Sequence, residues 1–289
     1  MPEVDCELYK LITVSGADAA GFLQGQLTQD VALLEGKPGL LAACCNPQGR
    51  VITTMWLVPQ EGSIGMILPG EMAEPIVALL SKYRMRAKVQ FDVSGEDWAN
   101  VAIDQDADLQ LLLSTGLLPG ANDVIFTQGI LAVHHGSTDQ FIELFAAKSA
   151  LESLNLEFSA PLRDDAWRSA LICAGLVLVS GENSEKYTPH MLNLDRLGAI
   201  SFGKGCYTGQ EVVARTEHLG SSKRRLMRYR CAARSIKVGD SLEDGDRPVG
   251  KVVNVSAENL LAVTPVDLHE KALMLDGEVA EPVGLPYDL

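Results

Sequence analysis

Residues 203–215 read GKGCYTGQEVVAR, a glycine-rich stretch that is followed at once by a helix-like run. Glycine is costly in regular elements and is favoured where the backbone must turn tightly. Thr208 and Glu211 have the spacing of a capping box, in which both side chains bond backbone N–H groups at a helix N-terminus. The stretch therefore predicts a tight turn and then a helix that Thr208 caps. The glycines of this turn are Gly203, Gly205 and Gly209.

Cys206 lies two residues before the predicted cap. Free N–H groups and the helix dipole favour a thiolate there, and Lys204 adds positive charge if its side chain turns the same way. Two interpretations stay open: an accessible, reactive thiol, or a small apolar side chain packed beneath the turn. His190 and His218 are near in sequence, but nothing fixes their distance from the thiol, so no base is assigned.

The composition is that of a globular protein with at least one proper core, since 47% of its 289 residues are hydrophobic and 21% charged. That length suits about two domains. We find no apolar run long enough to span a membrane and no visible signal peptide, so we expect a cytoplasmic protein. The cysteines lack metal-ligand spacing, which favours reduced thiols over a structural zinc site. They are Cys6, Cys44, Cys45, Cys173, Cys206 and Cys231.

The net charge of −14 argues against tight, nonspecific nucleic-acid binding, because phosphate contacts need a surplus of Lys and Arg. A local exception lies between Lys223 and Arg234, where six basic residues fall within twelve positions. This run is either a solvated strand face or a docking patch for an anionic ligand or partner.

The pattern of apolar residues predicts an α+β fold with mostly antiparallel pairing. The runs 40–45 and 51–58 flank NPQGR and predict a hairpin. The β-runs and turns after Gly220 predict a small all-β domain, such as a barrel. Further strands are expected at 8–14, 87–93, 98–103, 122–126, 130–134 and 140–144. Helices are expected at 17–27, 71–83, 107–114, 146–154 and 161–175.

The octapeptide KGCYTGQE is similar to the signature of the YgfZ family of folate-binding proteins, relatives of the glycine-cleavage T-protein (aminomethyltransferase). The segments SGAD, FLQGQLTQDV, LLAACCNPQGR and RDDAWRSALICAG, and the block 187–215, extend the resemblance over most of the chain. It implies a T-protein-like ring. The parts would be a discontinuous folate-binding α+β subdomain (1–90 with 158–220), a second α+β subdomain (91–157) and a C-terminal β-barrel (225–289).

The resemblance also implies a function: binding of tetrahydrofolate or another folate at the centre of the ring, with the signature cysteine near its mouth. The family maintains some iron–sulfur enzymes, including those that methylthiolate tRNA. The expected partners are therefore folate and iron–sulfur enzymes or their assembly factors, with an indirect contribution to tRNA modification. No membrane and no direct tight nucleic-acid binding are expected.

Carried over residue by residue, the resemblance makes Cys206 a functional thiol, with Lys204 beside it. Trp167 and Tyr9 are expected to stack on the folate, although either could be an ordinary packed aromatic residue. Arg215 could pair with the glutamate tail of folate or simply with Glu211 one turn earlier. The remaining signature residues are Gly205, Tyr207, Gly209, Gln210 and Glu211.

Two departures from the family pattern affect the function. Thr53 and Thr54 stand where the T-protein has paired aspartates, and a hydroxyl cannot be the charged partner of an amine at neutral pH. Cys173 replaces a glutamate that would hydrogen-bond the pterin ring, so either Asp164 or Asp165 takes over or the ligand differs.

Three functions compete at this point. The first is an accessory folate-binding protein of the YgfZ type. The second is a tetrahydrofolate-dependent aminomethyl- or methyltransferase, which Thr53 and Thr54 speak against. The third is a redox enzyme in which Cys173 or Cys231 resolves an oxidised Cys206, although the spacing supports neither pairing.

Overall fold

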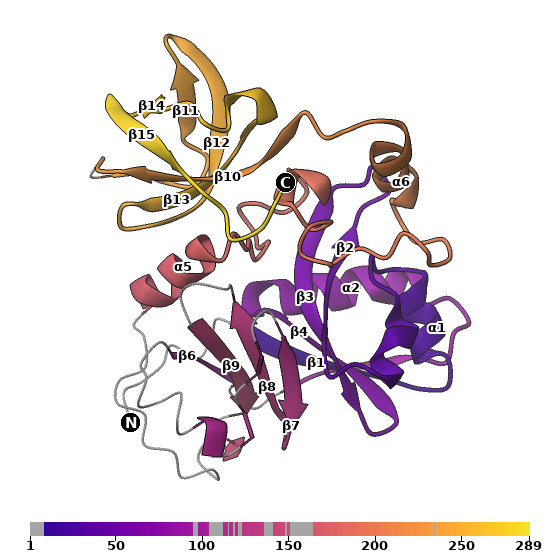
Figure 1. The fold of residues 1–289 in the computed structure, drawn as a ribbon. Helices are drawn as coiled ribbons and strands as arrows, with labels where there is room; N and C mark the ends of the chain where they lie inside the picture. Colours follow the sequence, from indigo (N-terminus) through magenta and orange to yellow (C-terminus); the bar gives the residue numbers. More distant parts are fainter. Residues whose placement is uncertain are drawn as a thin grey trace.

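The computed structural model has two open sheets and a closed barrel grouped around a long connecting segment (Figure 1). All the strand pairs that the structure describes are antiparallel, which confirms the predicted α+β fold. The structure describes residues 9–94, 98–103, 112–114, 116–117, 119–120, 123–135, 141–147, 149–150, 164–233 and 235–289. The helices expected at 107–114 and 146–154 lie largely outside these residues.

The first sheet has five strands in the order β2-β3-β4-β1-β5. Its centre is buried on both faces: all six residues of β2 are buried, as are the first eight of β3. One face packs against the helices α1 and α2, and the other faces the middle of the molecule. The elements are β1 (Tyr9–Ser15), α1 (Ala19–Gln24), η1 (Val31–Glu35), β2 (Leu40–Cys45), β3 (Val51–Gln60), β4 (Ser63–Pro69), η2 (Gly70–Met72), α2 (Ala73–Tyr83) and β5 (Gln90–Val93).

The second sheet has four strands in the order β6-β9-β8-β7. Its inner face joins the core of the first sheet, where the rings of Tyr9 and Phe145 meet edge to face at 4.8 Å. This contact joins the start of the first sheet to the second and so helps to fix one corner of the central region. The strands are β6 (Trp98–Ile103), β7 (Val124–Thr127), β8 (Ile130–His135) and β9 (Phe141–Ala147).

The C-terminal strands close into a barrel in the order β10-β13-β12-β11-β14-β15, as the sequence predicted. Closure pairs the strand edges that would otherwise be exposed. The interior is apolar around Tyr229, whose hydroxyl lies 3.1 Å from that of Thr264. The elements are β10 (Arg224–Cys231), β11 (Ser241–Asp244), β12 (Arg247–Ser256), β13 (Asn259–Pro265), η4 (Val266–Leu268), β14 (Leu273–Leu275) and β15 (Glu278–Val283).

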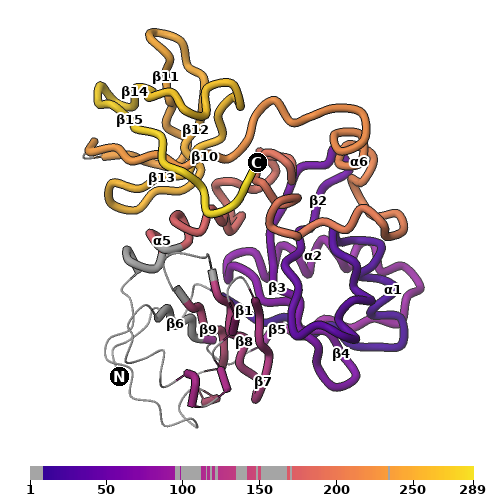
Figure 2. The backbone as a smooth tube through the Cα atoms, viewed as in Figure 1, coloured from indigo at the N-terminus to yellow at the C-terminus, as the bar shows by residue number. Residues whose placement is uncertain are grey.

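A long, mostly irregular segment, 174–223, connects the sheets to the barrel (Figure 2). It follows α5 (Asp164–Cys173) and contains η3 (His190–Leu192) and α6 (Gln210–Leu219). Many of its backbone groups bond to the first sheet; for example, the N–H of Val51 donates to the carbonyl of Tyr187. Among the described helices none is both long and apolar enough to cross a membrane.

Two arginines of the basic run are bonded within the protein. Arg225 is buried, and its guanidinium donates to both carboxylate oxygens of Asp195, at 2.9 and 2.8 Å. Arg224 donates to the carbonyl of Val249 within the barrel. Arg225 is therefore a structural cation that attaches the connecting segment to the barrel, whereas Lys223 and Arg230 are exposed.

Replacing Asp195 by asparagine is expected to destabilise the fold by about 3 kcal/mol at pH 7, because it leaves the Arg225 charge buried without a partner. Burial raises the pKa of Asp195, but the hydrogen bonds and charge of Arg225 outweigh it, so the pKa lies below its ordinary value. The stabilisation is thus present above about pH 4 and is lost as the pH falls through the lower folded-state pKa.

Urea unfolding of the wild type and the variant, repeated from pH 7 downward, measures this difference. The stability gap should narrow below about pH 4. Asp92→Asn, at an exposed position of β5, is the matched control and should cost little. Equal stability of Asp195→Asn and wild type at pH 7 would contradict the assignment.

Candidate functional site

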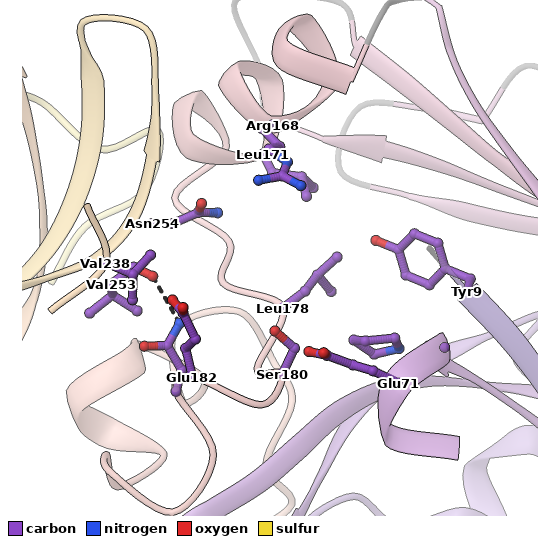
Figure 3. A pocket seen from close by; sticks show the side chains of 13 residues that line it. Tyr9, Glu71, Arg168, Leu171, Leu178, Ser180, Glu182, Val238, Val253 and Asn254 are labelled. Atoms are coloured by element: carbon purple, nitrogen blue, oxygen red, sulfur yellow. Dashed lines mark hydrogen bonds between the residues drawn. The ribbon is translucent and has the colours of Figure 1, made fainter. Parts of the chain in front are cut away.

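A pocket of about 580 Å³ opens where the first sheet, α5, the connecting segment and the barrel meet (Figure 3). Its volume is within the usual range for small-molecule sites, roughly 300–1,000 Å³. It is lined by Tyr9, Pro69, Gly70, Glu71, Arg168, Leu171, Leu178, Ser180, Glu182, Asn183, Val238, Val253 and Asn254.

Strand register brings Tyr9 to this pocket. β1 and β4 are antiparallel, with Tyr9 opposite Pro69, so the start of β1 lies beside the turn that carries Glu71. Tyr9 is 2% exposed and packs on Phe145 while it also lines the pocket. Its surroundings thus fit both a packed core aromatic and a residue that contacts a pocket ligand, and its contact with folate stays a prediction.

The pocket has charged groups on opposite sides. In Figure 3 the carboxylates of Glu71 and Glu182 lie at one side and the guanidinium of Arg168 at the other, with Leu178 between them. One oxygen of Glu71 accepts a hydrogen bond from the backbone N–H of Gly181 at 2.8 Å. Sequence reasoning missed these charged side chains, because nothing in the sequence indicates that residues 71, 168 and 182 meet.

Asn183 adds a polar group to the same wall. It is 6% exposed, and its side-chain N–H donates to the carbonyl of Val253 at 2.8 Å. Its side-chain oxygen has no hydrogen-bond partner among the described residues. Because a buried acceptor without a donor is costly, this oxygen favours a pocket ligand that offers an N–H or O–H group.

Trp167 belongs to α5, the helix that contributes Arg168 and Leu171 to the pocket. Its side chain lies outside the described part of the structure, as do those of Asp164 and Asp165, so their roles stay predictions. Cys173, at the end of the same helix, is half-buried and is absent from the pocket lining.

Thr53 and Thr54 are fully buried and take part in backbone hydrogen bonds. The hydroxyl of Thr53 donates to the carbonyl of Val179 at 2.9 Å, and that of Thr54 accepts from the Val179 N–H at 3.0 Å. Both threonines therefore attach β3 to the connecting segment. Neither supplies a charged group.

Lys204 is turned into the protein. Its ammonium group donates to the backbone carbonyls of Gln24, Leu27 and Gln29, each at 2.7 Å. Burial lowers the pKa of this ammonium to about 8, and the carboxylate of Asp30 opposes the shift. The side chain of Lys204 therefore turns inward, to backbone carbonyls at the end of α1 and in the segment that follows it.

The predicted capping box is also wrong. α6 begins at Gln210 after Gly209, whose φ is +83°, and no side chain caps it. Thr208 bonds instead to the side chain of Gln26, at 3.3 Å. The reason is contact with the β2–β3 hairpin: a Cβ on Gly209 would lie 2.4 Å from the carbonyl oxygen of Asn46.

Cys206 is exposed, so the packed interpretation does not hold. Gly203 and Gly205, on either side of Lys204, have open space around them and no positive φ, so neither position requires glycine. The tight turn lies a little later, at Tyr207–Gln210, where the N–H of Gln210 donates to the carbonyl of Tyr207 at 3.1 Å. By contrast, Cys44 and Cys45 are buried, which raises the pKa of Cys44 to about 12 and that of Cys45 further.

The described cysteines are all free thiols, and the proposed resolving partners do not suit a disulfide with Cys206. Cys231 is buried in the barrel core and Cys173 ends α5. Arg215 is exposed on α6 and does not line the pocket. Cys206 does not line the pocket either. Its loop packs through Gly209 against the end of β2, which is at the same end of the first sheet as Tyr9.

His190, Asp195 and Glu217 approach one another closely enough to share an ion, with ligand atoms within 4.8 Å. Both Asp195 oxygens already accept from Arg225, and His190 bonds Glu217 at 3.2 Å. The cluster thus serves to hold the end of α6 against the connecting segment.

Comparison with known proteins agrees with the fold and the motif. A relative from Hamiltonella defensa, named tRNA-modifying protein YgfZ, is 32% identical over 240 residues, which cover 81% of this chain and 71% of the relative. This chain belongs to the YgfZ family. YgfZ proteins from an Enterobacter species (30% identity, 84% and 75% covered) and Escherichia coli O157:H7 (31%, 81% and 74%) are similarly related. No family model matches the chain.

The solved structure of the glycine cleavage system aminomethyltransferase T from Bartonella henselae has the same fold. It superposes with a TM-score of 0.70 over 97% of this chain and 84% of the other, at 19% identity. The predicted T-protein-like fold is therefore confirmed. At this identity the likeness concerns the fold alone, so the roles of individual YgfZ-family residues have to be argued from the site.

Proposed function

We propose that this YgfZ-family chain is a folate-binding accessory protein. In this proposal it supports the assembly or repair of iron–sulfur clusters, and thereby tRNA modification, with Cys206 as its functional thiol. The cofactor is tetrahydrofolate or another folate. The partners are iron–sulfur enzymes or assembly factors in the cytoplasm, where the free thiols stay reduced.

The pocket carries the proposal. Its volume of about 580 Å³ accommodates a ligand of folate size, and its wall combines Tyr9 with aliphatic side chains and a few polar groups. A folate has the matching parts: a flat pterin ring with N–H donors, an aromatic middle and a carboxylate-bearing tail. Tyr9 and Trp167 are the aromatic residues that we propose to contact it.

The buried threonines favour an accessory role over aminomethyl transfer. A transferase of the T-protein type needs a charged group near the reacting nitrogen, and Thr53 and Thr54 supply only hydroxyls that are already hydrogen-bonded to the backbone around Val179. A one-carbon transfer assay with tetrahydrofolate should accordingly give no turnover.

The exposure of the Cys206 thiol supports the proposed role in iron–sulfur cluster assembly or repair. Cys206 lies on a loop whose neighbouring glycines leave open space around it, so a protein partner or a cluster could approach the sulfur closely. The loop itself is held by the three hydrogen bonds of Lys204, which we propose to be a positioning residue for this thiol.

Calorimetric titration with tetrahydrofolate tests the ligand. We expect saturable one-to-one binding to the wild type, weakened roughly ten-fold or more in Trp167→Ala because a stacking partner is lost. Trp98→Phe, in β6 and away from the pocket lining, is the control and should bind like the wild type. Absence of binding to the wild type would overturn the proposed ligand, and equal binding to Trp167→Ala would remove Trp167 from the site.

The thiol is tested in cells that lack the native protein. Cys206→Ala should fold normally yet fail to restore methylthiolated tRNA, whereas Cys173→Ala should restore it, because that thiol is half-buried and lies outside the pocket lining. Full restoration by Cys206→Ala would show that the thiol has no such function.

A further inference from the structure

We propose that the pocket holds its folate in one direction, with Glu71 reading the N–H edge of the pterin head and Arg168 binding the carboxylates of the glutamate tail. This inference rests on the proposed folate ligand. It assigns to this chain two recognition residues that the signature motif does not contain.

Glu71 is well placed to accept hydrogen bonds from the N–H edge of a pterin. It lies in η2, directly after β4, and projects into the pocket toward Ser180 (Figure 3). The Gly181 N–H fixes one carboxylate oxygen at 2.8 Å, and no described group is bonded to the other. A carboxylate accepts two parallel N–H bonds well, and a pterin offers such a pair from its ring N–H and its amino group.

Asn183 strengthens the preference for donors at this side of the pocket. Its side-chain oxygen is a buried acceptor without a described partner, and it lies one residue after Glu182 in the same wall. Acceptors and negative charge thus gather here. A ligand carboxylate would be repelled by Glu71 and Glu182, whereas N–H groups would be bound.

Arg168 defines the opposite side. It is exposed on α5, lines the pocket and has no hydrogen-bond or ion-pair partner among the described residues. A guanidinium binds carboxylates through two parallel N–H bonds. Leu171 and Leu178 lie between the charged sides and suit the aromatic middle of a folate.

This arrangement answers two questions left by the sequence. Cys173 cannot supply the acid that its family position normally holds, and it does not line the pocket, whereas Glu71 does. Arg215 was the expected partner of the glutamate tail, but it lies on α6 outside the lining, so Arg168 takes that role.

The test uses the purified full-length chain, calorimetry and three probes: tetrahydrofolate, 6-methyltetrahydropterin as the isolated head, and p-aminobenzoyl-glutamate as the isolated tail. Glu71→Gln keeps an oxygen for the Gly181 N–H but removes the charge. We expect it to weaken the head and tetrahydrofolate at least ten-fold and to leave the tail unchanged. Glu74→Gln, exposed on α2 and outside the lining, is its matched control and should change nothing.

Arg168→Gln should give the reverse pattern, weakening the tail and tetrahydrofolate at least ten-fold while the head binds as before. Arg215→Gln separates the two candidate arginines and should bind all three probes like the wild type. Loss of tail binding in Arg215→Gln but not in Arg168→Gln would overturn our assignment.

The outcomes also separate this inference from the proposed function. If the wild type binds none of the probes, the folate proposal itself fails. If it binds tetrahydrofolate and Glu71→Gln binds both that ligand and the isolated head with wild-type affinity, the direction is wrong while the folate proposal stands. Tighter tail binding in Glu71→Gln, from removal of a repelling negative charge, would indicate the opposite direction.

Discussion

Replacing Lys204 by methionine is expected to destabilise the protein by about 4 kcal/mol. Methionine retains much of the apolar stem but removes the ammonium that donates to the carbonyls of Gln24, Leu27 and Gln29. Each buried acceptor that loses its donor costs about 1–3 kcal/mol, and water can relieve only part of this because the residue is 8% exposed. The end of α1 and the signature loop should therefore separate.

Urea unfolding followed by circular dichroism measures this loss. Lys82→Met, at an exposed position in the last turn of α2, is the matched control and should stay within about 0.5 kcal/mol of the wild type. Hydrogen exchange should also accelerate locally, at residues 24–29 and 203–208. A loss below about 1 kcal/mol would mean that the three hydrogen bonds contribute little net stability.

Much of the fold could be predicted because it depends on local patterns. The β2–β3 hairpin follows from two apolar runs around NPQGR, and the barrel from short β-runs divided by turn residues. β4 (Ser63–Pro69) was missed, since a short continuous apolar run has no periodicity that distinguishes strand from helix. Pairing with β3 and β1 makes this segment a strand, and such pairing depends on residues that are distant in the sequence.

The site was predicted only in part, and the errors have one physical origin. The signature stretch left an accessible and a packed thiol open, and Cys206 is exposed. However, the partners of Lys204 lie 175 to 180 positions earlier in the chain, and no local rule identifies them. Glu71 and Arg168 were missed for the same reason, because the pocket joins side chains from elements far apart in sequence.

The capping box shows how a tertiary contact overrides a valid local pattern. Thr208 and Glu211 have suitable types and spacing, yet Gly209 approaches the hairpin so closely that the backbone turns there instead. The only sign of this close approach in the sequence is Gly209 itself. Among the glycines of the motif, Gly209 is the one whose surroundings require it, and Gly203 and Gly205 are not required by the fold.

Gly209→Ala should therefore be severely destabilising, whereas Gly205→Ala should be nearly neutral. At Gly209, alanine would need a φ near +83° and would place its Cβ 2.4 Å from the carbonyl oxygen of Asn46, so the loop has to move off the hairpin. Strain of this kind costs about 1–3 kcal/mol for the backbone alone, and the clash adds to it. At Gly205 an added Cβ meets nothing within 4 Å.

Thermal and urea unfolding of the two variants, measured side by side, give the difference in stability. Restoration of tRNA methylthiolation in cells then tests whether each variant still functions. Because Gly205→Ala should fold like the wild type, any loss of function in it would indicate that a partner approaches the backbone next to Cys206. Equal stability of the two variants would contradict the close contact between Gly209 and Asn46. A stable Gly205→Ala that also restores tRNA modification fully would mean that the open space beside the thiol is not needed by its partner.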